Sequence, residues 1–192
     1  MARVFVAGSI NMDVVAKAAR HPSPGETILA TQARLIPGGK GANQALASCK
    51  LGTETVLVGS VGLDHFGSEL CTFLKQSGVD LRHVKRVEGT ATGMALIVVD
   101  GLGENTIVVI PGANECLAPT DVVTTNCVRN DVLVAQLEIP LSTVIAFFRL
   151  GKSQGTRNIL NPSPAQNVPE ELLAVTDVVV VNASELHLLT NW

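Results

Sequence analysis

The sequence predicts an α/β fold: a doubly wound, mainly parallel sheet that carries a small separate β-sheet as a lid. Three observations lead to this prediction. Short, nearly continuous apolar segments rich in β-branched residues recur along the chain, as expected for strands covered on both faces. Segments with helical spacing of apolar residues alternate with them, which is typical of a parallel sheet. Two stretches interrupt this alternation with strands that have no helix beside them.

Composition narrows the class of protein. The chain has 192 residues, of which 46% are hydrophobic, and its 14 basic and 17 acidic side chains give a formal net charge of −3. This length can bury a core, and the apolar content excludes intrinsic disorder. Such a mild acidic balance gives no electrostatic basis for binding nucleic acid or an anionic membrane. We therefore expect neither nucleic acid nor a membrane as a partner.

The cysteines and the N-terminus indicate a cytoplasmic protein. The four cysteines are widely separated and form no C-x-x-C pair, which argues against zinc ligation and a disulfide framework. The apolar stretch at the N-terminus is too short for a signal peptide, and no other apolar run approaches membrane-spanning length. Reduced thiols in the cytoplasm are the interpretation that fits these features.

The main sheet and its helices can be assigned segment by segment. Glycine, proline and an aspartate mark several helix ends, with Gly52 after the first helix, Asp64 and Gly78 around the second, and Pro140 before the third. The expected strands are Val4–Ala7, Thr55–Val58, Asp131–Leu137, Arg157–Leu160 and Asp177–Val181. The expected helices are Ala42–Leu51, a segment around Phe66–Leu74, Leu141–Leu150 and Ala183–Leu189.

The interruptions form the small sheet. Glu26–Ile36 has the pattern of a strand without a helix partner, and Thr92–Asp100 and Asn105–Ile110 form a hairpin across a glycine-containing turn. We place these strands in a lid, at about residues 12–36 and 91–111, inserted within a single α/β domain of residues 1–192. A flap above the carboxyl edge of an α/β sheet lies where a ligand would be covered.

The segment Pro37–Gln44 is the strongest candidate for ligand binding. Its three glycines allow backbone N–H groups to approach a ligand, and the positive end of the following helix points at the same place. Lys40 and Asn43 lie on the first turn of that helix and can donate hydrogen bonds. A flexible loop before an ordinary helix is the alternative explanation.

Other polar residues follow predicted strands, where α/β proteins bind their ligands. Asn11 and Asp13 come after the first strand and alternate with Met12, so both can face one side, although turn chemistry also explains such a pair. Glu138 follows strand 131–137 and either faces a ligand or is solvated. Asn182 and Glu185 begin the last helix, at a spacing that also fits a structural capping box.

These segments together resemble the ribokinase-type (PfkB) carbohydrate kinase family. The opening Val-Ala-Gly-Ser-Ile-Asn-Met-Asp is similar to the start of that family, and Pro37 to Gly52 is similar to its first signature. Val58 to Gly67 is similar to its V-G-x-D-x-x-G segment. Gln136-Leu137-Glu138, Leu160-Asn161-Pro162 and Asn182-Ala183-Ser184-Glu185 then follow in the order of the family. The match extends over essentially the whole chain.

The resemblance implies roles for individual residues. It implies that the hydroxyls of a sugar are bound by Asn11, Asp13, Gly39, Lys40, Asn43 and Glu138. It implies that Asn182 and Glu185 lie near the phosphates of ATP, with Glu185 acting through water on Mg²⁺, and that a monovalent cation such as K⁺ takes part. The lid would close over the sugar and carry a homodimer contact.

The activity implied is ATP-dependent phosphorylation of D-ribose at its 5-hydroxyl. The alternatives are another sugar or nucleoside kinase of this family, such as a deoxyribokinase or a fructokinase, or a catalytically silent homologue that binds sugar. The second family signature, D-T-x-G-A-G-D, which contains the catalytic base and the anion hole, does not occur in the sequence. The chain also stops a few residues into its last helix. We therefore expect that the C-terminal part of the fold is missing and that these 192 residues alone are inactive.

Overall fold

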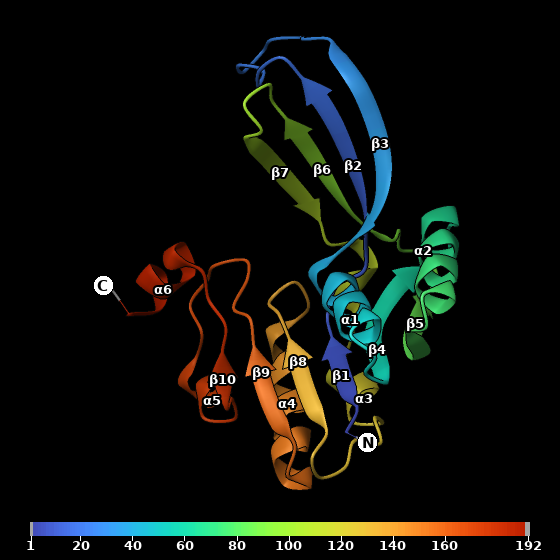
Figure 1. The fold of residues 1–192 in the computed structure, drawn as a ribbon, viewed down its shortest axis with the longest axis vertical. Coiled ribbons are helices and arrows are strands. Elements are labelled where there is room, and N and C mark those ends of the chain that lie inside the picture. The colour runs from blue at the N-terminus through green and yellow to red at the C-terminus, as the bar shows by residue number, and fades with distance from the viewer. Residues whose placement is uncertain (1, 191–192) are drawn as a thin grey trace.

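The computed structural model describes residues 2–190 and contains two sheets (Figure 1). The larger sheet has six strands, all of them parallel, in the order β10-β9-β8-β1-β4-β5. Its strands are β1 (Val4–Ala7), β4 (Thr55–Gly62), β5 (Asp80–Val87), β8 (Val132–Ala135), β9 (Arg157–Leu160) and β10 (Val178–Val179). The predicted doubly wound parallel sheet is therefore confirmed.

Helices cover this sheet on both faces. The helical segments are α1 (Lys40–Lys50), α2 (His65–Gln76), the 3₁₀ helix η1 (Gly112–Cys116), α3 (Pro119–Val122), α4 (Leu141–Gln154), α5 (Glu170–Leu173) and α6 (Ala183–Thr190). Side chains of α1 and α2 pack with Val6 and Leu57 in one core. Residues of α3, α4 and α5 pack with Phe5 and Leu133 in the other. Successive strand residues point to opposite faces, so Phe5 and Val6 belong to different cores.

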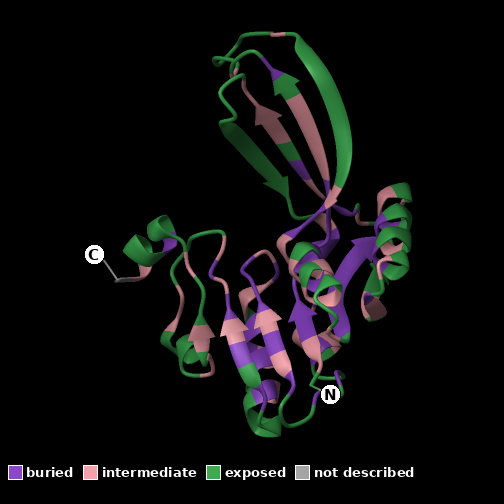
Figure 2. Ribbon diagram, viewed as in Figure 1, coloured by how far each residue is buried: buried purple, intermediate pink, exposed green. Residues whose placement is uncertain are grey.

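The second sheet stands beyond the carboxyl ends of the main strands and is more exposed than the main sheet (Figures 1 and 2). It contains β3 (Ala30–Gly38), β2 (Asn11–Ala18), β6 (Gly93–Val99) and β7 (Asn105–Ile110), in that order. Strands β2 and β6 are parallel, and the two outer pairs are antiparallel. We call these four strands the lid sheet. The separate sheet that the sequence predicts is therefore present.

Asp64 caps α2 as predicted and also fixes one root of the lid sheet. Its side chain accepts hydrogen bonds from the backbone N of Gly67 at 2.7 Å and from the backbone N of Thr92 at 2.7 Å. The hydroxyl of Thr92 donates to the same carboxylate at 2.6 Å, and Thr92 directly precedes β6. One carboxylate thus joins the start of a helix of the main domain to the start of a lid strand.

Several expected boundaries were wrong. The strand expected over Glu26–Ile36 begins only at Ala30, because residues 26–29 have no strand partner, and it continues to Gly38. The strands expected over Asp131–Leu137 and Asp177–Val181 are shorter, and strand Thr55–Val58 continues to Gly62. The sequence analysis assigned no strand to β5, whose charged side chains at an exposed sheet edge obscure the apolar pattern. It also missed the short segments η1, α3 and α5.

No helix in the described part of the chain, residues 2–190, is long and apolar enough to span a membrane. The four cysteines carry free thiols.

Candidate functional site

The candidate site lies at the point of the main sheet where the order in which strands are added reverses. Starting from β1, the chain builds β4 and β5 on one side and β8, β9 and β10 on the other. The carboxyl ends of β1 and β8 therefore face a crevice between diverging connections, which is where open α/β sheets bind ligands. Ser9 follows β1 and Glu138 follows β8, and the Ser9 hydroxyl donates to Glu138 Oε2 at 2.5 Å.

Glu138 is held close to the start of α1. Its Oε1 lies 3.5 Å from Lys40 Nζ, and its Oε2 accepts from the Lys40 backbone N at 3.5 Å. The side chain of Glu138 is 11% exposed and that of Lys40 is 37% exposed. The ion pair is therefore shielded on the carboxylate side, while the ammonium group remains accessible to a ligand.

Two glycines bring α1 this close. Gly39 has φ = 91°, and a Cβ there would lie 2.7 Å from the backbone N of Asn11 and from the Ser9 carbonyl O. A Cβ on Gly41 would lie 2.5 Å from the carbonyl C of Gly8. Only residues without a side chain permit this approach. The glycine-rich segment is therefore a close-packed junction between α1 and the end of β1.

Asn11 is oriented by Asn114, a residue that sequence reasoning missed. The Nδ2 of Asn114 donates to Asn11 Oδ1 at 2.7 Å, and Asn114 Oδ1 accepts from the backbone N of Ile10 at 2.9 Å. Both side chains are buried, with 3% and 1% exposure. With its oxygen held by Asn114, Asn11 keeps the N–H donors of its amide for a ligand.

Asp13 is the second carboxylate of the site. Its pKa is raised because the group is partly buried and because Glu138 repels its negative charge, and Lys40 offsets part of this shift. In β3, Ile36 is paired with Asp13, and Gly38 lies two residues further along. A Cβ on Gly38 would lie 2.1 Å from Asp13 Oδ2. The glycine thus leaves room for the carboxylate. Asn11 and Asp13 lie in β2, where the sequence analysis expected either a ligand-facing segment or a turn.

All six residues that the resemblance implied for sugar binding line one small cavity of about 120 Å³. The remaining wall comes from the lid sheet, through Ala95, Ile97, Ile107 and Val109. The ladder register pairs Ala95 with Val109 and Ile97 with Ile107, so these four apolar side chains share one face. Asp13 pairs with Ala95 in the next ladder and belongs to the same face. The cavity therefore has a polar floor and an apolar wall.

A second cavity of about 480 Å³ shares several of these residues and extends toward η1 and Pro164. It is lined by Asn11, Lys40 and Glu138 together with Asn114, Glu115 and Gln166. The lid-sheet residues and Asn114 were not named from the sequence. The continuous apolar run along 107–110 was the available signal for the wall, whereas nothing local marked Asn114.

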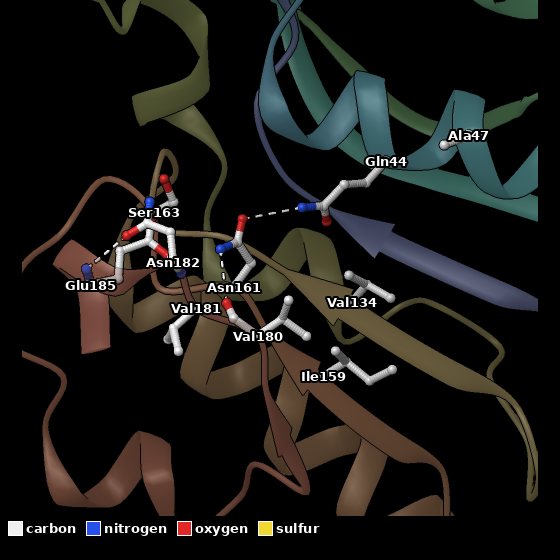
Figure 3. A pocket seen from close by; sticks show the side chains of 10 residues that line it. All are labelled: Gln44, Ala47, Val134, Ile159, Asn161, Ser163, Val180, Val181, Asn182 and Glu185. Atoms are coloured by element: carbon white, nitrogen blue, oxygen red, sulfur yellow. Dashed lines mark hydrogen bonds between the residues drawn. The ribbon is translucent and has the colours of Figure 1, made fainter. Parts of the chain in front are cut away.

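Asn182 and Glu185 lie apart from the six, in a cavity of about 590 Å³ (Figure 3). Asn182 Oδ1 accepts from the Glu185 backbone N at 2.8 Å, and Glu185 Oε2 accepts from the Asn182 backbone N at 3.0 Å. This reciprocal pair is a capping box at the start of α6, which was the structural alternative. Glu185 is 6% exposed. Its Oε1 has no hydrogen-bond partner among the described residues and remains available to water or a cation.

The comparisons with known proteins show which family this chain resembles. The model of the pfkB family of carbohydrate kinases matches residues 1–191. A ribokinase of Staphylococcus aureus is 35% identical over 98% of this chain and 63% of its own length. A deoxyribokinase of Salmonella typhi is 34% identical over 97% of this chain and 62% of its own length.

Solved structures give the same result. The Arabidopsis thaliana ribokinase complexed with ribose and ATP superposes with a TM-score of 0.85 at 33% identity, covering 100% of this chain and 64% of that one. The chain thus spans less than two thirds of the length of these relatives. With the family model matching almost every residue, the chain belongs to the pfkB family of carbohydrate kinases.

Proposed function

We propose that the protein is a sugar kinase that transfers the γ-phosphoryl group of ATP to the 5-hydroxyl of D-ribose. The observation that carries the proposal is the cavity in which Asp13 and Glu138 face Lys40 and Asn43 beneath an apolar wall. Carboxylates accept hydrogen bonds from pairs of hydroxyls, and the ammonium and amide groups donate to their oxygens. The relatives named as a ribokinase and a deoxyribokinase support a pentose as the substrate.

Within this proposal, each side chain has a defined task. Asp13 and Glu138 orient the sugar through its secondary hydroxyls, while Lys40, Asn43 and Asn11 donate to its oxygens. The four apolar residues of the lid sheet pack against the carbon face of the ring and exclude water. Fixing the sugar in this way supplies the orientation that an in-line displacement requires. The lid sheet would close over the bound sugar.

Asn182 and Glu185 are proposed to serve the phosphate side of the reaction. ATP supplies the phosphoryl group when bound, and Mg²⁺ screens its charge. The free oxygen of Glu185 fits a role as an acceptor for water held by Mg²⁺, since this ion favours oxygen ligands and retains several waters. Residues 2–190 contain no cluster of three or more His, Cys, Asp or Glu side chains that could hold a metal, so this assignment depends on Glu185 alone.

The test is a kinase assay on the whole protein with ATP, Mg²⁺ and a series of sugars, with and without K⁺. We expect kcat/KM to be highest for D-ribose, with 2-deoxyribose and fructose used less well. A preference for 2-deoxyribose would identify a deoxyribokinase, the alternative that its 34% identical relative supports. Saturable sugar binding without turnover would indicate a silent homologue. The 192 residues alone should transfer no phosphoryl group, since they lack the D-T-x-G-A-G-D signature.

The affinity for ribose should depend on pH through Asp13. The carboxyl accepts hydrogen bonds from hydroxyls when it is ionised, and burial together with Glu138 raises its pKa above the ordinary value of 3.8. Affinity is therefore complete above this raised pKa and falls as the pH drops through it. Calorimetric titration at a series of pH values should show that the affinity for ribose begins to fall at a pH above the range in which an ordinary aspartate titrates. A dissociation constant that does not depend on pH, or that changes only in the range of an ordinary aspartate, would contradict this role.

The whole protein should form a homodimer through its lid sheet. Leu96 and Val108 are paired across β6 and β7, point away from the cavity face and are 43% and 57% exposed. Exposed apolar strands of this kind favour association. Light scattering at micromolar concentration should give a dimer mass, and Val108→Lys should give a monomer. The control Leu51→Lys, at a leucine that is 86% exposed at the end of α1, should remain dimeric. A monomeric parent protein would contradict the prediction.

A further inference from the structure

Three amide side chains connect the two halves of the site. Gln136, which follows β8, donates through Nε2 to Gln44 Oε1 at 2.5 Å. Gln44, on α1, donates through Nε2 to Asn161 Oδ1 at 3.3 Å, and Asn161 donates through Nδ2 to the Val180 carbonyl at 3.0 Å. Figure 3 shows the contacts of Asn161 with Gln44 and with Val180, at the wall of the cavity of about 590 Å³ that also contains Asn182 and Glu185. We call these three side chains the amide network.

The orientation of every amide in this network is fixed from one end. The Val180 carbonyl can only accept, so Asn161 must present its NH₂ group there and its oxygen to Gln44. Gln44 must then donate to Asn161 and accept from Gln136. The remaining Gln136 oxygen, Oε1, is buried against Gly8 without a hydrogen-bond partner among the described residues. Turning any one amide over would break its contacts, so the network has a single direction.

The network bridges the crevice between the diverging halves of the sheet. Gln44 is adjacent to Asn43 and lies one turn from Lys40, on a helix that packs against β1 and β4. Gln136 lies two residues before Glu138. Gln136, Asn161 and Val180 all belong to the other side of the crevice, at the ends of β8, β9 and β10, and Val180 lies two residues before Asn182. Each end of the network is therefore close in sequence to a proposed binding residue.

We propose that Gln44 is a positioning residue, which sets the helix that holds the sugar in register with the Val180–Asn182 segment on the phosphate side. This inference rests on the proposed function. Gln44 acts through Asn161 and need not contact either substrate. An in-line transfer is sensitive to displacements of about 1 Å between the reactants, so loss of the register slows the transfer without weakening sugar binding.

Because each amide in the network donates in one direction, a substitution at Gln44 can remove one of its two hydrogen bonds and keep the other. Gln44→Glu keeps the oxygen that accepts from Gln136 but loses the NH₂ group that donates to Asn161. Gln44→Met has a similar length and loses both contacts. The matched control is Gln76→Leu, which removes an exposed glutamine amide from α2, away from the site.

The first measurement is steady-state kinetics of the whole protein together with ribose titration. For Gln44→Glu and Gln44→Met we expect kcat to fall about tenfold or more, with the ribose dissociation constant within twofold of the parent and Gln76→Leu unchanged. A purely structural role would lower thermal stability without separating kcat from binding. An unchanged kcat, or a parallel loss of ribose binding, would overturn the proposal.

The second measurement does not depend on activity. Nuclear magnetic resonance of the ¹⁵N-labelled protein reports the side-chain amide of Asn161 and the backbone amides of Val181 and Asn182. Gln44→Glu should shift all three signals, and Gln76→Leu should shift none. Absence of these shifts would overturn the coupling even if kcat fell. Should the parent protein phosphorylate no sugar, the proposed function fails, and these signals alone decide whether Gln44 positions the phosphate-side segment.

Discussion

Replacing Asp13 with asparagine should weaken ribose binding by about 100-fold or more without lowering the stability of the fold. In the proposed function the carboxylate accepts hydrogen bonds from sugar hydroxyls, and hydrogen bonds to a charged group contribute roughly 1.5–3 kcal/mol each. Two such bonds correspond to a factor of about 100 or more in affinity. The raised pKa of Asp13 means that its ionised form is disfavoured in the folded protein, so the neutral amide should leave the thermal midpoint unchanged or raise it.

Calorimetric titration with ribose and a thermal melt measure the two effects separately. Asp100→Asn is the matched control, because Asp100 lies at the other end of β6, in the turn before β7, where it accepts from the backbone N of Leu102 and Glu104. That variant should bind ribose as the parent does. If Asp13→Asn kept its ribose affinity, the assignment of the sugar to this cavity would be wrong. A large drop in its thermal midpoint would show that Asp13 has a structural role instead.

Gly39→Ala should cost roughly 4 kcal/mol of unfolding free energy. The backbone conformation, with φ = 91°, costs an alanine about 1–3 kcal/mol, and forcing a methyl group into a packed junction costs about 1–3 kcal/mol more. The atoms that the methyl group would meet are the backbone N of Asn11 and the carbonyl O of Ser9, neither of which can move as a side chain can. The change would also displace α1 from Glu138, so sugar binding should be lost.

Gly52→Ala separates the two contributions. Gly52 has φ = 87°, but beyond its two chain neighbours no atom lies within 4 Å of the position of its Cβ. Urea unfolding should therefore show only the backbone cost for Gly52→Ala, about half of the loss expected for Gly39→Ala. Equal losses for the two variants would show that the junction between α1 and β1 relaxes easily, and that close packing does not position the helix.

The main sheet could be predicted because its strands have simple patterns. Val4–Ala7 and Arg157–Leu160 were assigned with the boundaries that the structure gives. Strand β5 was missed because it lies at the sheet edge, where charged residues such as Arg82 and Lys85 replace an apolar run. The strand expected from Glu26 started too early, because the N-terminal end of β3 is set by its pairing with β2, which local sequence does not reveal.

The candidate site was predictable to the extent that its residues follow strands or begin helices. The sequence and the family resemblance together named the six residues that meet in one cavity. Asn114 and Gln136 could not be found in this way, since each acts on a partner more than 90 residues distant. Local patterns predict where the chain turns toward a ligand. Long-range polar contacts that hold those residues in place become visible only in the folded structure.

The most direct test of the central claim is a titration of the ¹⁵N-labelled whole protein with ribose, monitored by nuclear magnetic resonance. The claim is that the cavity at the carboxyl ends of β1 and β8 holds the sugar. We predict saturable shifts of the backbone signals of Asn11, Asp13, Gly39, Lys40, Asn43 and Glu138, and of the facing residues of β6 and β7, with remote signals such as those of α4 unchanged. Saturable shifts confined to another surface, or no shifts at millimolar ribose, would contradict the claim.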